Sequence, residues 1–220
     1  MAGLTSSTIG RKYAMALSAM FLLIFLVMHL AVNMLSVFGE AAYNNASQFM
    51  GYNPLIQFLM QPVLMFATIF HFVMGFILEA KNNRARPVKY AVNNRAANST
   101  WMSRNMLFSG AVILAFLALH MYDFWVHEMN YKYVEGLPVK EDRFWEDLHH
   151  KFADPIRVGA YIISFVLLGL HLAHGFQSSF QSVGARHPKY TPMIKAFGNW
   201  YSVLIPLGFI FIAVYHFVTQ

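Results

Sequence analysis

Five long apolar stretches divide the chain, and each can cross a lipid bilayer as a helix. A hydrocarbon core of about 30 Å takes roughly 20 apolar residues in a helix, because every backbone polar group must be satisfied within the segment. The sequence therefore predicts an all-α integral membrane protein, a single domain of residues 1–220 folded as a five-helix transmembrane bundle. The spans are expected at about 13–38, 54–78, 106–126, 156–180 and 201–218.

Composition agrees with lipid as the solvent and excludes several kinds of chemistry. The chain is 57% hydrophobic and only 12% charged. It has no cysteine, which excludes disulfides, iron–sulfur ligation, thiol catalysis and the thioether attachment of a haem. The net charge of +6 does not indicate binding to nucleic acid, because the positive residues are spread between the apolar stretches. The first stretch lacks a small-residue cleavage site, so we expect it to remain as a span.

Lysine and arginine favour one side of the predicted bundle. They precede the first span and fill the second and fourth connections, whereas the other two connections are richer in acidic residues. Because positive residues near span ends stay in the cytoplasm, the N-terminus is expected inside and the C-terminus outside. The residues that carry this signal are Arg11, Lys12, Lys81, Arg84, Arg86, Lys89, Arg95, Arg104, Arg186, Lys189 and Lys195.

Histidines occur one each in the first four predicted spans. They are His29, His71, His120 and His171. An imidazole in lipid leaves a donor and an acceptor to be satisfied, so it is a functional hypothesis by default. A single one is more often a hydrogen-bonded contact between helices, but four in consecutive spans indicate a shared role. His174 is a second candidate in the fourth span, and His216, near the end of the fifth, is left unassigned.

Depth in the membrane sorts these histidines into two pairs. At about 1.5 Å of rise per residue, His29 and His120 lie roughly 25 Å from the cytoplasmic edge. His71 and His171 lie roughly 15 to 22 Å from that edge. We name the first two the outer pair and the other two the inner pair. Two layers of two imidazoles match the needs of two six-coordinate haem irons, which have no open position for oxygen and are suited to electron transfer.

A glycine follows two of the histidines by one helical turn, in the pattern H-x-x-x-G. Gly75 follows His71, and Gly175 follows His171. A patch without side chains would let a porphyrin approach the backbone, although small residues also serve ordinary helix packing in membranes. The pattern favours His171 over His174 as the ligand, and leaves His174 to hydrogen-bond a haem propionate or a neighbouring helix.

Further motifs accompany the histidines. They are TSSTIGRK from Thr5, FLVMHLAVN around His29, EAAYNN from Glu40, NPLI from Asn53, HFVMG from His71 and NRARP from Asn83. In content, order and spacing they resemble the single-subunit, di-haem cytochrome b558 anchors of succinate:quinone oxidoreductase and fumarate reductase. The resemblance covers essentially the whole chain and is most specific through the first two spans. In the third and fourth spans it rests mainly on His120 and His171.

The resemblance implies that two haems b are bound, the outer by His29 and His120 and the inner by His71 and His171. It implies two partners on the cytoplasmic face, a flavoprotein with covalent FAD and an iron–sulfur subunit, as in respiratory complex II of the bacterial inner membrane. Electrons would pass between succinate or fumarate and a membrane quinone, often menaquinone in this family. No dicarboxylate chemistry is expected in this chain, and whether the whole complex dimerises is left open.

One position departs from the family's pattern. Members thought to move compensating protons carry a glutamate two residues before the fourth-helix ligand, whereas this chain has Gly169, which puts that proton route in doubt. Polar side chains near span ends could pair with haem propionates, because buried carboxylates need donors or cations, although snorkelling to the interface is their commoner role. These candidates are Ser7, Arg11, Lys12 and Arg157.

Asp123 is the one acidic residue within an apolar stretch, three positions beyond His120. It is either a hydrated carboxylate at the membrane interface or a proton donor or acceptor for a quinone near the outer pair. Asn33 and Glu40 are expected at a similar depth, and we take all three as candidates for quinone binding.

Other functions fit part of the pattern. The di-haem membrane cytochromes of formate dehydrogenases and hydrogenases usually have four spans and another arrangement of histidines. A haem-free, proton-coupled transporter could use intramembrane histidines as a relay, but it would show internal repeats and broken helices, which are not evident in the sequence. The complex III type of cytochrome b places two histidines on one helix about one haem spacing apart, an arrangement that no span here has.

Overall fold

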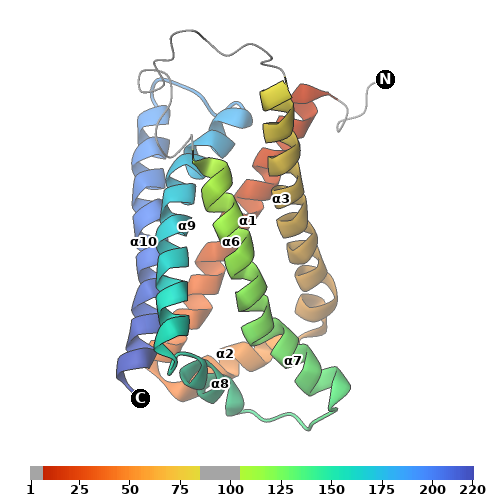
Figure 1. Ribbon diagram of the computed structural model, residues 1–220, viewed down its shortest axis with the longest axis vertical. Helices are drawn as coiled ribbons and strands as arrows, with labels where there is room; N and C mark the ends of the chain where they lie inside the picture. The colour runs from red at the N-terminus through yellow and green to blue at the C-terminus, as the bar shows by residue number, and fades with distance from the viewer. Residues whose placement is uncertain (1–6, 85–104) are drawn as a thin grey trace.

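The structure, a computed structural model, describes residues 7–84 and 105–220. Five helical segments in it are long and apolar enough to cross a membrane. They are Ile9–Phe38, Ile56–Arg84, Met106–Val134, Pro155–Ser182 and Thr191–Val218. The described residues form no strand, and the five segments stand side by side along the long axis of the molecule (Figure 1). The prediction of a multi-pass, five-helix membrane protein is therefore confirmed.

Three of the spans run in one direction and two return. α1 (Thr8–Phe38), α6 (Met106–His120) and α10 (Thr191–Val218) run downward in Figure 1, and α3 (Gln61–Arg84) and α9 (Pro155–Ser182) run upward. Helix α1 begins at one end of the bundle and α10 finishes at the other. We call these ends the N-terminal end and the C-terminal end.

Parts of the second and third spans are π-helical. η1 (Ile56–Met60) precedes α3, while η2 (Met121–Val126), the short α7 (His127–Met129) and η3 (Asn130–Val134) continue α6. A π-turn widens the helix and is frequent at functional sites. Because η2 begins directly after His120, the α-helical register assumed for the third span changes at that residue.

Polar caps fix where α1 and α9 begin. The Ser7 hydroxyl accepts a hydrogen bond from the Gly10 amide at 2.9 Å, and the Asp154 carboxylate accepts one from the Ile156 amide at 2.9 Å. These caps satisfy amide donors that the start of a helix leaves unpaired. Pro155 occupies the first turn of α9, where its missing N–H is not needed.

Packing is tightest between α9 and α10. Phe165 of α9 stacks on Phe209 of α10 with ring centroids 5.3 Å apart, and both side chains are buried. α3 lies at the periphery, and Met74 is its only buried residue. Large apolar side chains such as Phe66 and Ile163 remain exposed on the outside of the bundle, as expected for surfaces that face lipid.

Two short helices cross the C-terminal end of the bundle and form what we call the cap. They are α2 (Glu40–Tyr52) and α8 (Arg143–Lys151) (Figure 1). The Asn44 amide joins them, donating to the Asp142 carbonyl oxygen at 3.0 Å and accepting from the Trp145 amide at 2.8 Å. The Trp145 indole donates to the Ser36 carbonyl oxygen at 3.0 Å and so fastens α8 to α1. Neither helix was predicted from the sequence, because both segments lie in the connections between apolar stretches.

Ion pairs fasten the cap to the extension of α6. Glu128 pairs with Lys132 at 2.7 Å and with Arg143, and Arg143 also pairs with Asp147 at 3.0 Å. Burial by itself would lower the pKa of Arg143, but the hydrogen bond and charge of Glu128 hold that pKa above its ordinary value. Arg143 therefore keeps its charge although only 5% of the residue is exposed.

All five spans are longer in the structure than in the prediction, and the third and fifth differ most. The third continues to Val134 instead of ending near residue 126, and the fifth begins at Thr191 instead of residue 201. The prediction counted only apolar residues. The helices continue into polar residues at their ends, so the predicted spans are shorter than the helices. Some predicted features lie outside the described residues, namely the start of the TSSTIGRK motif, Arg86, Pro87, Lys89, Arg95 and Arg104.

Candidate haem site formed by two pairs of histidines

The structure brings the four span histidines together in two pairs, each pair joining two helices. His29 of α1 and His120 of α6 have ring centroids 5.7 Å apart. His71 of α3 and His171 of α9 have ring centroids 6.4 Å apart. These are the outer pair and the inner pair that the depth argument predicted.

The spacing within each pair suits one metal ion between two imidazoles. An imidazole nitrogen binds a metal at about 2.0–2.1 Å, so two rings on opposite sides of one ion have centroids roughly 6 Å apart. All four histidines are half-buried as whole residues. Among the described residues, no group of three or more His, Cys, Asp or Glu side chains could hold a metal ion. Two imidazoles suffice for haem, however, because the porphyrin supplies the remaining four nitrogens.

Each ring of the inner pair contacts a serine hydroxyl. His71 Nδ1 lies 3.2 Å from Ser18 Oγ, and His171 Nδ1 lies 3.2 Å from Ser109 Oγ. The two serines come from α1 and α6, the helices that carry the outer pair. Helices α1 and α6 thus each carry one histidine of the outer pair and one serine that contacts a histidine of the inner pair.

The outer pair lies among aromatic rings. Phe25 stacks on His29 at 5.1 Å, and Phe124 lies 5.3 Å from His120, both measured between ring centroids. The Asn33 amide donates to the His29 carbonyl oxygen at 2.8 Å and lies 3.4 Å from His29 Nδ1. His120 Nδ1 is buried and has no hydrogen-bond partner among the described residues. No hydroxyl therefore supports this pair in the way that serines support the inner one.

The helices that carry these residues repeat a pattern that the sequence reading did not predict. α1 and α6 both contain M-x-x-S-x₆-F-x-x-x-H. The matched residues are Met15, Ser18, Phe25 and His29 in α1, and Met106, Ser109, Phe116 and His120 in α6. The serine precedes the histidine by eleven positions, which is close to three helical turns, so both side chains lie on the same face. The two layers are accordingly separated by roughly 16 Å along α1.

The repeat extends to the helices packed against α1 and α6. A Cβ placed on Gly75 would lie 3.6 Å from the Met15 methyl group, and one placed on Gly175 would lie 3.4 Å from the Met106 methyl group. Methionine tips therefore cover both glycines, and such flexible side chains can give way to a bound group. Both copies of the repeat run in the same direction, unlike the inverted repeats of many transporters.

Asp123 is fully buried, with 0% of the residue exposed, so the alternative of a hydrated interfacial carboxylate is wrong. Arg157 Nε lies 3.2 Å from Asp123 Oδ2, and the Tyr161 hydroxyl donates to the same oxygen at 3.0 Å. Asp123 Oδ1 is buried and has no hydrogen-bond partner among the described residues. Tyr161 was not among the predicted site residues, although its position four residues after Arg157 places both side chains on one face of α9.

The candidates for haem propionates fall into different environments. Arg157 is engaged by Asp123, and Ser7 serves as the cap of α1. Lys12 is exposed, whereas Arg11 Nε is a buried donor without a partner among the described residues. His174 is half-buried and makes no hydrogen bond to a described residue. Arg11 is therefore the candidate whose buried donor most needs an anionic partner.

The candidates for quinone binding do not form one cluster. Asn33 contacts His29 and accepts a 3.4 Å hydrogen bond from Tyr43, whose pKa burial raises to about 12. Asp123 belongs to the group with Arg157 and Tyr161. Glu40 is exposed at the start of α2, and no hydrogen bond or ion pair links it to the other two.

His216, unassigned from the sequence, fastens the cap from inside. It is fully buried in α10, with its Nε2 2.9 Å from Ser36 Oγ. Its Nδ1 lies 3.2 Å from His149 Nδ1 of α8, and the Trp145 ring stacks on His149 at 4.5 Å. These contacts join α1, α8 and α10, so the geometry gives His216 a structural role.

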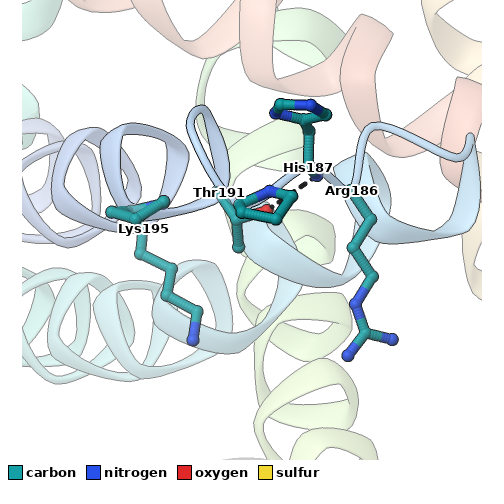
Figure 2. Close-up of a pocket in the computed structure, with 6 residues that line it drawn as sticks. Arg186, His187, Thr191 and Lys195 are labelled. Atoms are coloured by element: carbon teal, nitrogen blue, oxygen red, sulfur yellow. Dashed lines mark hydrogen bonds between the residues drawn. The ribbon is translucent and has the colours of Figure 1, made fainter.

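An open hollow lies near the N-terminal end, where α10 begins. It is lined by Arg186, His187, Pro188, Thr191, Pro192 and Lys195. Figure 2 shows Arg186 and Lys195 extending in the same direction, with His187 on the opposite side of the segment. Neither cation forms an ion pair with a described residue. The hollow is thus separate from the histidine pairs and presents positive charge.

Comparisons with models of protein families, with curated proteins and with solved structures found no match to this chain. The histidine pairs and the motifs around them are therefore the basis on which a function can be proposed.

Proposed function

We propose that this chain is a di-haem cytochrome b, the membrane anchor of a succinate:quinone oxidoreductase or fumarate reductase. The observation that carries the proposal is the pairing of four histidines from four spans into two sites, each with ring centroids about 6 Å apart. Two imidazoles on opposite sides of one metal ion match the axial ligation of a six-coordinate haem. The motifs that resemble those anchors support the particular complex.

The residues present fit a haem b at each pair. His29 and His120 would hold the outer haem, and His71 and His171 would hold the inner one. Each haem would supply a one-electron centre without an open position for oxygen. Methionine tips cover Gly75 and Gly175 and can move aside, and the buried Arg11 Nε is a donor for a carboxylate near the N-terminal end.

The partners in this proposal are a flavoprotein with FAD and an iron–sulfur subunit on the cytoplasmic face of a bacterial inner membrane. The positive charge of Arg186 and Lys195 at the N-terminal end supports docking of soluble subunits there, because charge complementarity steers association. In this arrangement the inner pair lies nearer the soluble partners, and the outer pair lies nearer the cap.

The quinone, expected to be menaquinone, would react near the outer pair. Asp123 supports this placement, because Arg157 and Tyr161 hold its Oδ2 while Oδ1 is left as a buried acceptor three residues beyond His120. A hydroquinone hydroxyl could donate to Oδ1. The carboxylate would then accept one of the two protons that the hydroquinone releases when it gives up its two electrons.

The deciding experiment is a reduced-minus-oxidised absorption spectrum of the purified chain, with haem quantified per chain. We expect two haems b for each chain. His71→Ala or His171→Ala should remove one centre, the same one in both variants, and His29→Ala or His120→Ala should remove the other. His150→Ala is the matched control, because His150 is exposed on α8 and belongs to neither pair.

Two results would contradict the proposal. An intact, folded chain without haem would exclude a cytochrome. Loss of both centres to the same extent in every histidine variant would exclude the two separate sites. Reduction of the haems by succinate, in membranes that contain the soluble subunits, would distinguish this complex from a formate dehydrogenase or a hydrogenase.

A further inference from the structure

We propose that Ser18 and Ser109 are matched positioning residues of the inner pair, each accepting Nδ1–H from one imidazole so that Nε2 faces the metal. The inference rests on the proposed function, since it concerns the haem that His71 and His171 would hold. Neither serine belongs to a motif that suggested the function.

The hydrogen bonds of the serines determine which ring nitrogen carries the proton. Ser18 Oγ donates to the Met15 carbonyl oxygen at 2.8 Å, and Ser109 Oγ donates to the Met106 carbonyl oxygen at 3.0 Å. A hydroxyl has one proton to donate, and a carbonyl oxygen can only accept. Each hydroxyl oxygen therefore faces its imidazole as an acceptor, and the proton between them belongs to histidine Nδ1.

The bond to serine sets the tautomer of both rings. A neutral imidazole with its proton on Nδ1 has its lone pair on Nε2, so Nε2 of His71 and of His171 is the atom that can bind iron. An acceptor behind a metal-bound imidazole fixes the ring's orientation and raises its basicity as a ligand.

A serine that bonds back to its own helix is common in membrane helices and indicates nothing by itself. Ser164 and Ser182 do so in α9 without touching a histidine, at 2.8 Å each. Ser36 of α1 contacts His216 of α10, but through Nε2 and beside the cap, away from both histidine pairs. The informative feature is that Ser18 and Ser109 occupy the same place in a repeated pattern and contact the same atom of two facing histidines, at the same 3.2 Å.

The outer pair provides an internal comparison. Asn33 presents an amide nitrogen, which is a donor, at 3.4 Å from His29 Nδ1, and His120 Nδ1 has no partner among the described residues. Neither outer imidazole has a hydroxyl acceptor behind it. The two haems would thus differ in the basicity of their ligands, and only the inner one should respond to the serines.

The test is a redox titration of both haems in the purified chain, for Ser18→Ala, Ser109→Ala and the double variant. Without the acceptor each imidazole donates less charge to iron, which favours the ferrous state, so the potential of the inner haem should rise. A tenfold change in its reduction equilibrium per serine corresponds to about 59 mV for one electron. Because each serine contacts a different histidine of the inner pair, the potential of the inner haem should shift in the double variant by about the sum of the two single shifts.

Controls separate positioning from general packing. Ser164→Ala removes a buried hydroxyl of α9 that bonds only to its own helix, and should leave both potentials unchanged. Ser18→Thr and Ser109→Thr keep an acceptor and should restore the potential of the inner haem. The low-spin EPR signal of that haem should change in the alanine variants and return in the threonine variants.

Several outcomes would overturn the inference. They are an inner potential that does not move in the alanine variants, an outer potential that moves as far as the inner one, or an equal shift in Ser164→Ala. The failure of the proposed function looks different, because a wild-type chain that carries no haem excludes the cytochrome before any serine is changed.

Discussion

A carboxylate without access to water has to be neutralised by its neighbours, and Asp123 shows how this chain does so. Its two partners come from α9, far along the sequence, and both hold the same oxygen. Removing one partner from a buried pair leaves a charge without compensation, which costs more than the pair contributes in place. A variant that lacks only one partner should therefore be less stable than one that lacks both charges.

At the scale of residues we therefore predict that Arg157→Gln destabilises the protein by about 3 kcal/mol, at the low end for a broken buried pair because 26% of the Arg157 side chain is exposed. Unfolding in mixed detergent micelles would measure the change. Adding Asp123→Asn should recover most of the lost stability, because the uncompensated charge is then gone. If the single variant were as stable as the wild type, the ion pair could not be what keeps Asp123 buried.

Residues differ in how far the sequence predicts their surroundings. The sequence singled out four histidines, because an imidazole in lipid has a donor and an acceptor that must be satisfied. They are His29, His71, His120 and His171. Ser18 and Ser109 were not singled out, because serine is ordinary in membrane helices and its partner lies on another helix. The eleven-residue spacing that α1 and α6 share was the available signal. The burial of Asp123 depends on side chains of α9 and on the π-turn η2, and neither follows from the spacing of apolar residues.

At the scale of elements, the contact between α9 and α10 depends on Gly169. A Cβ there would lie 3.0 Å from the Ser202 carbonyl oxygen and 3.4 Å from Pro206 Cγ. Backbone cannot move aside as a flexible side chain can. The space beside Gly169, where the family that this chain resembles places a glutamate, is thus filled by α10 in this chain.

We predict that Gly169→Ala lowers the free energy of unfolding by about 1–3 kcal/mol, because the added methyl group forces the two helices apart. Gly159→Ala is the matched control on the same helix, since a Cβ there would meet nothing within 4 Å. It should change stability by less than about 1 kcal/mol, with helix propensity favouring alanine. Equal effects at both positions would mean that the α9–α10 contact is looser than the structure has it.

The five spans were predictable at this scale, because the bilayer imposes a length that the apolar stretches meet. The cap helices α2 and α8 were not, because they are short and polar and their stability comes from contacts such as Asn44 with Trp145. A short helix of this kind is stable only when it packs on other parts of the protein, and here several spans together form the surface on which it packs.

At the scale of the whole molecule, positive charge gathers at the N-terminal end. Lys81, Arg84, Arg186 and Lys195 lie there, and Arg186 and Lys195 line the hollow where α10 begins. If soluble subunits dock on this end, Arg186 and Lys195 strengthen their binding by electrostatic attraction. Replacing both cations by acidic residues would turn that attraction into repulsion.

We predict that Arg186→Glu combined with Lys195→Glu reduces the soluble subunits that copurify with the chain by about tenfold, or about 1.4 kcal/mol of binding free energy. Quantifying flavin and iron per chain after purification would measure it, and the effect should weaken as salt is raised. The control is Lys140→Glu, which reverses the charge of an exposed residue in the connection before α8. It should leave the amount of copurified soluble subunits unchanged. Undiminished copurification in the double variant would place the docking surface elsewhere.

The repeat also bears on how such a molecule could arise. Each half consists of a helix with M-x-x-S-x₆-F-x-x-x-H and a neighbour with H-x-x-x-G. It contains one histidine of the outer pair, one histidine of the inner pair and one serine that contacts an inner histidine. Both halves run the same way through the bundle. A two-helix chain could therefore complete both sites by pairing with a second copy of itself, which is the arrangement that duplication and fusion of a shorter ancestor would leave behind.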